Sequence, residues 1–259
     1  MRSRRRPGPL RTVVLAAVAS LLATLAACSH DQAADRAPGS PITSAEATVL
    51  SKVLYADHQQ GGADFEVSAP YAEGTVLTLT GEVDFSRDTG RARAVTTYTN
   101  GQPQETRTLF FSQTDLWQGD VPGLADALTA AKLPTAAYVR RPVVTTAAAG
   151  SPSLLDVLVQ MVTRLSARSA DDPRSFDAYT WAGSQSVNGQ LASVFRSGTG
   201  ARIAVAADSH LLLQYAAPVQ GFTVTITLAD HGPRDVTLPA DDDTVDMAAH
   251  PEIAAALGL

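Results

Sequence analysis

From about residue 63 onward, apolar and polar residues alternate along much of the chain. A period of two is typical of a strand that buries one face and exposes the other. Two stretches show it best: Leu77, Leu79, Val83 and Phe85, and later Phe222, Val224, Ile226 and Leu228. Gly81 falls at an inward position of the first, which predicts a bulge or bend there. Turn signals, above all Asn100-Gly101, separate further predicted strands at residues 91–99, 106–112, 114–118, 176–183, 190–196, 201–207 and 211–216.

Other stretches have the helical period. Thr43 and Glu46 form a capping-box pattern before an apolar stripe that ends at Gly61-Gly62. The clearest helix begins after Pro152 and Ser153, and its apolar stripe consists of Leu154, Leu158, Met161, Val162 and Leu165. Shorter helices are predicted at residues 122–133 and 251–257, with a proline- and alanine-rich connection at 134–150. The order of strands, then helices, then strands predicts an α+β fold with helices gathered on one face of an antiparallel sheet.

The first 27 residues have the pattern of a secretion signal. Residues 1–11 carry five arginines and no acid, and residues 12–27 are uncharged and mostly Ala, Val and Leu. A membrane-spanning helix is the alternative, but 16 residues fall short of the roughly 20 that a bilayer core requires. The start is also reminiscent of a twin-arginine signal, although Pro7, Gly8 and Pro9 stand where apolar residues are expected, so the export route stays open.

The signal ends in Leu25-Ala26-Ala27-Cys28, which resembles the lipobox of bacterial lipoproteins. That resemblance implies cleavage between Ala27 and Cys28 and a diacylglycerol on the Cys28 sulfur, with further acylation (palmitate, for example) of the new amino group. Two or three acyl chains make a durable membrane anchor where one does not. The alternative, a buried free thiol, does not suit a residue between a signal and a polar segment. We therefore expect a lipid-anchored protein on the extracytoplasmic face of the cell membrane.

Length, charge and cysteine content limit the possible domain organisation and the possible partners. Cleavage would leave 232 of the 259 residues, which divide into a lipidated flexible tether at residues 28–41 and one α+β domain at residues 42–259. The mature chain would keep 15 basic residues against 26 acidic ones, a formal charge of −11. This charge argues against nucleic acid as a partner and against electrostatic docking on anionic headgroups. With Cys28 as the only cysteine, no disulfide within the chain is possible.

No pattern typical of catalysis is present. The five histidines lie far apart in sequence, and no nucleophile elbow, P-loop or dinucleotide-binding motif occurs. A site assembled from distant residues stays open as an alternative, but we expect no enzyme, no cofactor and no metal. Residues 241–243 with Asp246 could hold calcium or form a solvated loop, and we favour the loop. Arg140 and Arg141 could bind an anion or be exposed charges, and we favour exposed charges. Trp117 and Trp181 are expected in the core rather than in a ligand pocket.

The mature chain as a whole resembles the LppX/LprG-type lipoproteins of actinobacteria, which share the LolA-like half-barrel. The resemblance rests on the lipobox, the short tether, the opening helix and the late segment 178–238, with Val187-Asn188-Gly189 and Val236-Thr237-Leu238-Pro239. It implies a curved antiparallel β half-barrel whose helices cover the concave face and enclose a hydrophobic cavity. That cavity would hold lipid or glycolipid acyl chains, which the protein carries across the cell envelope, with an envelope transporter as a further partner.

On this resemblance the residues expected to line the cavity are the inward positions already named: Leu77, Leu79, Val83, Phe85, Leu154, Leu158, Met161, Val162, Leu165, Phe222, Val224, Ile226 and Leu228. The alternative function is a surface-anchored module with a closed core that binds another envelope protein. A cavity between sheet and helices would favour the carrier, and a solid core with an exposed apolar patch would favour the protein-binding module.

Overall fold

The computed structural model describes residues 36–145 and 152–259. The predicted signal, Cys28 and most of the tether lie outside these residues. The chain from Ala37 to Leu259 is one compact unit. It holds every described helix and strand and all the hydrophobic clusters, which is what an independently folding domain requires. No helix among the described residues is both long and apolar enough to cross a bilayer.

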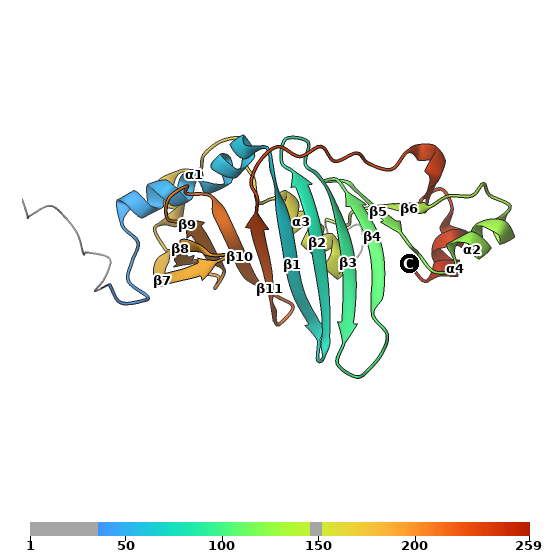
Figure 1. The fold of residues 1–259 in the computed structure, drawn as a ribbon, viewed down its shortest axis with the longest axis horizontal. Helices are drawn as coiled ribbons and strands as arrows, with labels where there is room; N and C mark the ends of the chain where they lie inside the picture. The colour runs from blue at the N-terminus through green and yellow to red at the C-terminus, as the bar shows by residue number, and fades with distance from the viewer. Residues whose placement is uncertain (1–35, 146–151) are drawn as a thin grey trace, which may run out of the picture. The chain divides into compact units, whose positions relative to one another are not determined.

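One sheet of twelve strands forms the body of the unit (Figure 1). Its first half consists of β1 (Gly62–Ala72), β2 (Thr75–Asp84), β3 (Thr89–Tyr98), β4 (Glu105–Phe111), β5 (Asp115–Gly119) and β6 (Tyr138–Pro142). Its second half consists of β7 (Thr180–Val187), β8 (Gln190–Arg196), β9 (Arg202–Ala206), β10 (Leu212–Val219) and β11 (Phe222–Ala229). Each half is an antiparallel meander, and β1 joins them by pairing with β11. The short β12 (Thr244–Asp246) pairs in parallel with β6.

One helix precedes the strands in sequence, one follows them, and the other helices and short 3-10 turns lie between strands. They are α1 (Ser44–Gln60), α2 (Leu124–Ala131), α3 (Leu154–Thr163), the turns η2 (Pro173–Phe176) and η3 (Asp241–Asp243), and α4 (Pro251–Leu257). The predicted capping box of α1 is present: the Thr43 hydroxyl accepts from the amide of Glu46, whose carboxylate accepts from the amide of Thr43. Gly61 ends α1 in the left-handed conformation, with φ 89°.

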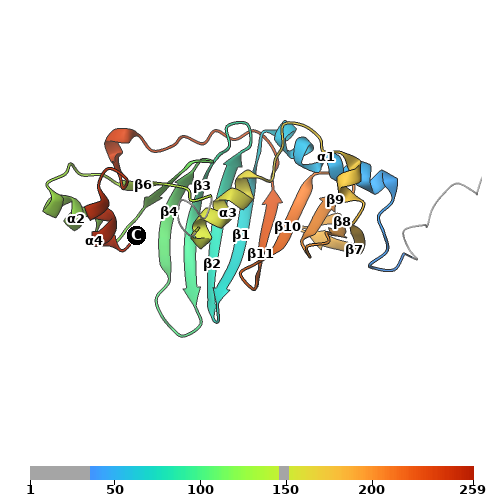
Figure 2. The ribbon, with the colours of Figure 1, turned by 180° about the vertical axis from the view of Figure 1, so that it is seen from behind.

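The predicted fold class is confirmed, with one correction to the placement of the helices. α1 and α3 cover the inner face of the curved sheet and share its main hydrophobic cluster (Figures 1 and 2). In contrast, α2 and α4 pack on each other beside β6 and β12, at the other end of the sheet from α1. Their apolar faces are too far along the sheet to reach the main cluster, and they form a smaller cluster of their own.

Several predicted boundaries need correction. Residues 134–150 were expected to be a connection, but they contain β6, which continues the sheet beyond β5. The strand predicted at 176–183 begins only at Thr180, because Pro173–Phe176 forms the turn η2. The ladder from β1 through β2 to β3 is continuous at Gly81, so no bulge occurs there. Instead, a Cβ at Gly81 would overlap the carbonyl oxygen of Arg91, and the close approach of β3 explains the glycine.

Candidate functional site

The residues expected to line a cavity mostly form packed core. Ten of them are buried in the main cluster: Leu77, Leu79, Val83, Phe85, Leu158, Val162, Leu165, Val224, Ile226 and Leu228. Leu154 and Met161 are half-buried and pack against the same cluster. Phe222 is half-buried at the start of β11, next to the β10–β11 turn. The inner face of the sheet is therefore filled along most of its described length, and two cavities remain at the two ends of α3.

An apolar pocket of about 390 Å³ lies at the C-terminal end of α3. From the predicted set it includes only Met161 and Leu165. The rest of its wall comes from three places: α1, the segment that runs from the end of α3 through the turn η2 to Tyr179, and the inner face of β9 and β10. Its lining residues are Leu50, Val53, Leu54, Met161, Arg164, Leu165, Asp171, Phe176, Tyr179, Ile203, Leu212 and Tyr215. We take this pocket, named the α1–α3 pocket, as the candidate functional site.

Strand pairing on one side and backbone hydrogen bonds on the other fix the positions of the walls of the α1–α3 pocket. On the sheet side, Ile203 and Tyr215 are directly opposite each other in the β9–β10 ladder, so their side chains share the inner face. On the helix side, the segment after α3 is fixed to α1 by two backbone hydrogen bonds. The amide of Ala167 donates to the carbonyl of Leu54 (2.9 Å), and that of Asp171 donates to the carbonyl of Ser51 (2.8 Å).

The polar groups of the pocket are few and of mixed charge. Arg164 and Asp171 contribute one charge of each sign, and two tyrosines add hydroxyl groups. Burial raises the pKa of Tyr179, with smaller contributions from Tyr215 and Asp171, so Tyr179 stays a neutral hydrogen-bond donor at physiological pH. A mainly apolar wall with a few polar groups is typical of sites for small apolar ligands, and the volume is within the usual range of about 300–1,000 Å³.

A second, smaller cavity lies at the N-terminal end of α3. It has about 320 Å³ and is lined by Leu77 and Leu154 of the predicted set, together with polar groups such as Glu105, Arg107 and Gln118. The fully buried side chains of Leu158 and Val162 separate it from the α1–α3 pocket. In the described part of the chain, packed core thus separates these two cavities of the inner face, whereas the sequence led us to expect one large cavity.

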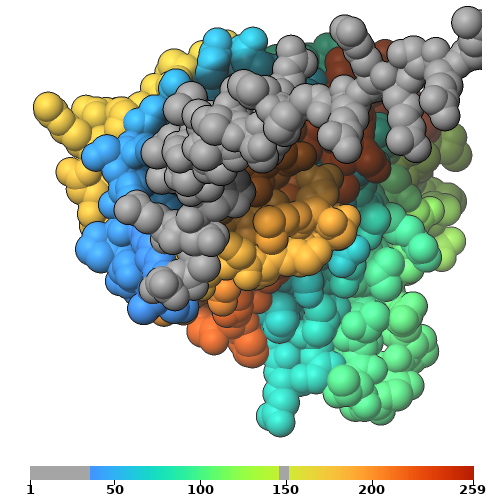
Figure 3. All heavy atoms as spheres, turned by 60° about the vertical axis from the view of Figure 1, so that its left-hand side comes forward, coloured from blue at the N-terminus to red at the C-terminus, as the bar shows by residue number. Residues whose placement is uncertain are grey.

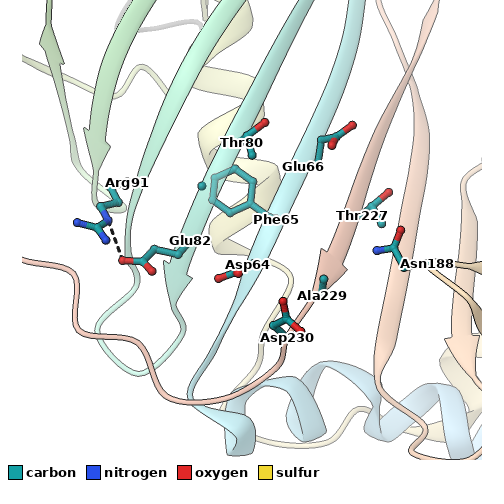
Figure 4. Close-up of a pocket in the computed structure, with 11 residues that line it drawn as sticks. Asp64, Phe65, Glu66, Thr80, Glu82, Arg91, Asn188, Thr227, Ala229 and Asp230 are labelled. Atoms are coloured by element: carbon teal, nitrogen blue, oxygen red, sulfur yellow. Dashed lines mark ion pairs between the residues drawn. The ribbon is translucent and has the colours of Figure 1, made fainter.

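A third hollow, of about 520 Å³, is larger than these two cavities and lies on the opposite, outer face of the sheet (Figure 4). Its walls carry Asp64, Glu66, Glu82, Arg91 and Asp230, besides threonines and Asn188 from the β7–β8 turn. Ion pairs join its charges: Arg91 to Glu82 at 2.8 Å, and the neighbouring Arg234 to Asp64 at 2.8 Å. An acyl chain in this groove would displace the water that solvates these charged groups, which is unfavourable. We therefore do not take the groove as the site.

Two motifs from the sequence have other roles than expected. Arg141 is not an exposed charge: its guanidinium donates to Asp156 Oδ1 at 2.6 Å, and the Asp156 side chain is only 2% exposed. Arg140 pairs with Asp241 and Asp246, so these carboxylates neutralise an arginine. The described residues contain no group of three or more potential ligands that could hold a metal ion. Trp117 is buried, and Trp181 packs against the main cluster.

The structure also brings together a buried pair that the sequence reading missed. Asp57, near the end of α1, is fully buried and its Oδ1 accepts from the amide of Leu212 (3.2 Å). The Nε2 atom of His231 lies 3.6 Å from the same oxygen. The two residues are 174 positions apart, but Asp57 follows the apolar stripe of Val53 and Leu54 in α1, and a carboxylate on such a stripe is the signal that could have found it.

Comparisons with known proteins add a likeness of fold only. No protein-family model matches the sequence, and no curated protein matches it. Among solved structures, LprF from Mycobacterium bovis has a TM-score of 0.45 at 11% identity, over 78% of this chain and 99% of that one. An uncharacterized conserved protein from Thermus thermophilus has a TM-score of 0.39 at 11% identity, over 79% of this chain and 99% of that one. The fold itself is an α+β half-barrel, as the strand order, the curved sheet and the helices on its inner face show.

Proposed function

We propose that the protein binds an acyl chain of a lipid in the α1–α3 pocket and carries it through the cell envelope while anchored to the membrane by lipid on Cys28. The observation that supports this is the pocket itself: an apolar space of about 390 Å³ between α1, α3 and the inner face of the sheet. Burying apolar area releases about 25 cal/mol per Å², so a tail that enters this space is held without any specific polar contact.

The size of the pocket limits the cargo. Because Leu158 and Val162 close the middle of the inner face, the site accepts one tail rather than several. Arg164, Asp171 and the neutral hydroxyl of Tyr179 belong to the same pocket and would contact polar atoms next to the tail. No bond is made or broken in this scheme, so the protein would act as a carrier and not as an enzyme.

The test is binding of cis-parinaric acid, a fluorescent fatty acid, to the unit Ala37–Leu259. Met161→Trp and Ile203→Trp each place an indole in the pocket, and both are expected to weaken binding at least about tenfold by occupying the space of the tail. Leu191→Trp is the matched control, because Leu191 is 63% exposed and is not part of the pocket wall. Binding that is equal in all three variants would show that the tail does not enter this pocket.

Native mass spectrometry of the same unit, purified without detergent, then identifies the cargo. A co-purifying lipid of near-unit stoichiometry that is lost in Met161→Trp supports the carrier. A clean mass that stays unchanged after incubation with envelope lipids contradicts it and favours the protein-binding module.

A further inference from the structure

The hairpin of β8 and β9 ends in two arginines that face each other. Arg196 is the last residue of β8 and Arg202 the first of β9, and the two are directly opposite in the ladder. Both are exposed. They share the outer face of the sheet, because their neighbours Phe195 and Ile203 point into the main cluster on the inner face.

This pair is not neutralised within the part of the chain that the structure describes. Neither guanidinium has a carboxylate within 4 Å or a hydrogen-bond partner there, whereas Arg87, Arg91, Arg140, Arg141 and Arg234 all pair with acids. The flanking positions on the same row, Thr180 and Ala216, are uncharged. Like charges directly opposite each other destabilise a sheet, so the pair costs stability unless an anion binds it.

The loop between the arginines has further donors for an anion. Its sequence is Ser197-Gly198-Thr199-Gly200-Ala201. The hydroxyls of Ser197 and Thr199 lie 2.8 Å apart, and the amides of Gly198 and Thr199 have no acceptor among the described residues. A Cβ built on Gly198 or Gly200 would meet no atom within 4 Å, so the tip is open to a ligand from outside. Guanidinium groups, hydroxyls and free amides together are the donors that phosphate groups prefer.

The hairpin lies at the end of the domain where the chain arrives from its N-terminal segment. The amide of Gly39 donates to the carbonyl of Trp181 (2.7 Å), and Pro41 bridges to Thr180, which in turn pairs with Arg196. In Figures 1 and 3 the blue start of the described chain lies beside the yellow and orange strands β7 to β9. Gly39 is only eleven positions after Cys28, and such a segment spans at most about 40 Å.

We propose that the β8–β9 hairpin is a docking surface for the phosphate headgroups of an anionic bilayer. The domain is acidic overall, so an anionic surface repels most of it but attracts the pair of unneutralised arginines at this hairpin. Docking there would set the orientation of a tethered domain relative to the membrane. The net charge of the mature chain argues against attraction to anionic headgroups. At this hairpin, however, two arginines without acidic partners among the described residues favour such attraction locally. The inference does not depend on the α1–α3 pocket.

The experiment measures cosedimentation of the unit Ala37–Leu259, which lacks Cys28 and most of the tether, with two kinds of vesicle. One kind is phosphatidylcholine alone, and the other contains phosphatidylglycerol in addition. The wild-type unit is expected to bind the anionic vesicles only, and less strongly as salt increases. Each basic residue near an anionic surface contributes roughly fivefold in affinity, so Arg196→Gln with Arg202→Gln should weaken binding by roughly 25-fold.

Arg93→Gln is the matched control. Arg93 is also exposed on the outer face and has no carboxylate partner among the described residues, but it lies on β3. The Arg93→Gln variant should bind the anionic vesicles as strongly as the wild type does. Binding that is unchanged in the double variant, equal on both kinds of vesicle, or weakened as much by Arg93→Gln would overturn the proposal. Thermal melting adds a second readout: the double variant should melt at the same temperature as the wild type or higher, since a repulsive pair is gone. A lower melting temperature would mean that the arginines serve the fold instead.

Discussion

At the C-terminal end of α1, burial raises the pKa of Asp57 to about 8, although the hydrogen bond from the Leu212 amide opposes the shift. Between about pH 4 and pH 8 the unfolded state ionises at this position and the folded state does not. The free energy of unfolding should therefore fall as pH rises through that range. Asp57→Asn, which cannot ionise, should remove most of this fall. Urea titrations at about pH 5 and pH 8 measure it, and an unchanged difference between the two would contradict the role given to Asp57.

His231 should act in the opposite direction. Burial lowers its pKa, and Arg234 lowers it further, while the hydrogen bond to Leu212 and the charge of Asp230 oppose the shift. The folded state then resists protonation, and stability should fall as pH drops below about 6.5. In His231→Gln the loss on the acid side should disappear while the loss on the alkaline side remains. The same urea titrations, extended to about pH 4.5, separate the two residues. If His231→Gln instead flattened the alkaline side, the two assignments would be exchanged.

Leu158 and Met161 are neighbours on α3 that differ in what surrounds them. Leu158 is fully buried, whereas Met161 is half-buried at the α1–α3 pocket. Leu158→Trp should lower the free energy of unfolding by about 1–3 kcal/mol, because a packed core must move to admit an indole. Met161→Trp has open space to occupy and should cost less than about 1 kcal/mol. Urea unfolding compares them; equal losses would mean that the pocket is not accessible to a side chain.

These residues also show what a sequence pattern can predict. The period-two and helical patterns identified Leu77, Leu158 and Ile226 as inward-facing, and all three are buried. The same patterns could not separate the lining of a cavity from packed core, because both require an apolar residue at the same position. Whether space is left depends on how far α3 lies from the sheet, and no single residue encodes that distance. Part of the pocket wall comes from residues around the turn η2, such as Phe176 and Tyr179, which belong to no predicted apolar stripe.

At the scale of the element, α3 is held to the sheet by one buried ion pair. Asp156 closes the capping box of α3 with Ser153 and also accepts from Arg141 of β6. Burial alone would raise the pKa of Asp156, but the bonds from Arg141 and Ser153 outweigh it and lower the pKa. The carboxylate is therefore charged, and removing Arg141 would leave that charge buried without a partner.

The adjacent arginine supplies the control for this pair. Arg141→Ala should cost roughly 3 kcal/mol of stability, and Arg140→Ala at most about 1 kcal/mol, because the partners of Arg140 are more exposed. Chemical denaturation of both variants measures the difference. Equal, small losses would show that the buried pair does not hold α3 in place.

Elements with a strong local signal were predicted well, and those made by tertiary pairing were not. The ends of α4 and β8 agree with the sequence pattern because proline and glycine mark them. β6 was missed because its five residues include two arginines and a proline and show no alternation. What makes this stretch a strand is its pairing with β5 on one side and β12 on the other.

For the whole molecule, the sequence predicted the fold class but not the order of strands. The central position of β1 depends on its pairing with β11, from Asp64 with Ala229 to Ser68 with Thr225. That pairing connects a strand from the first part of the domain with one from its last part, and no turn signal in the sequence predicts it. The β1–β11 pairing joins two meanders that share the main hydrophobic cluster. At the end of the sheet formed by β6 and β12, these two strands form a smaller cluster with α2 and α4.

This smaller cluster should open independently of the rest. It holds only six buried apolar residues, and its edge strand β12 pairs over three residues. Regions with few buried contacts open at lower free energy than the global unfolding. In native-state hydrogen exchange, the amides of α2, β12 and α4 should exchange together and earlier than those of β1, β2 and β11. Ile253→Ala removes a fully buried side chain from this cluster and should accelerate exchange there by about 30-fold or more, given the usual cost of at least about 2 kcal/mol. The exchange of β1 and β11 should not change. If it accelerates equally, the two clusters unfold as one unit.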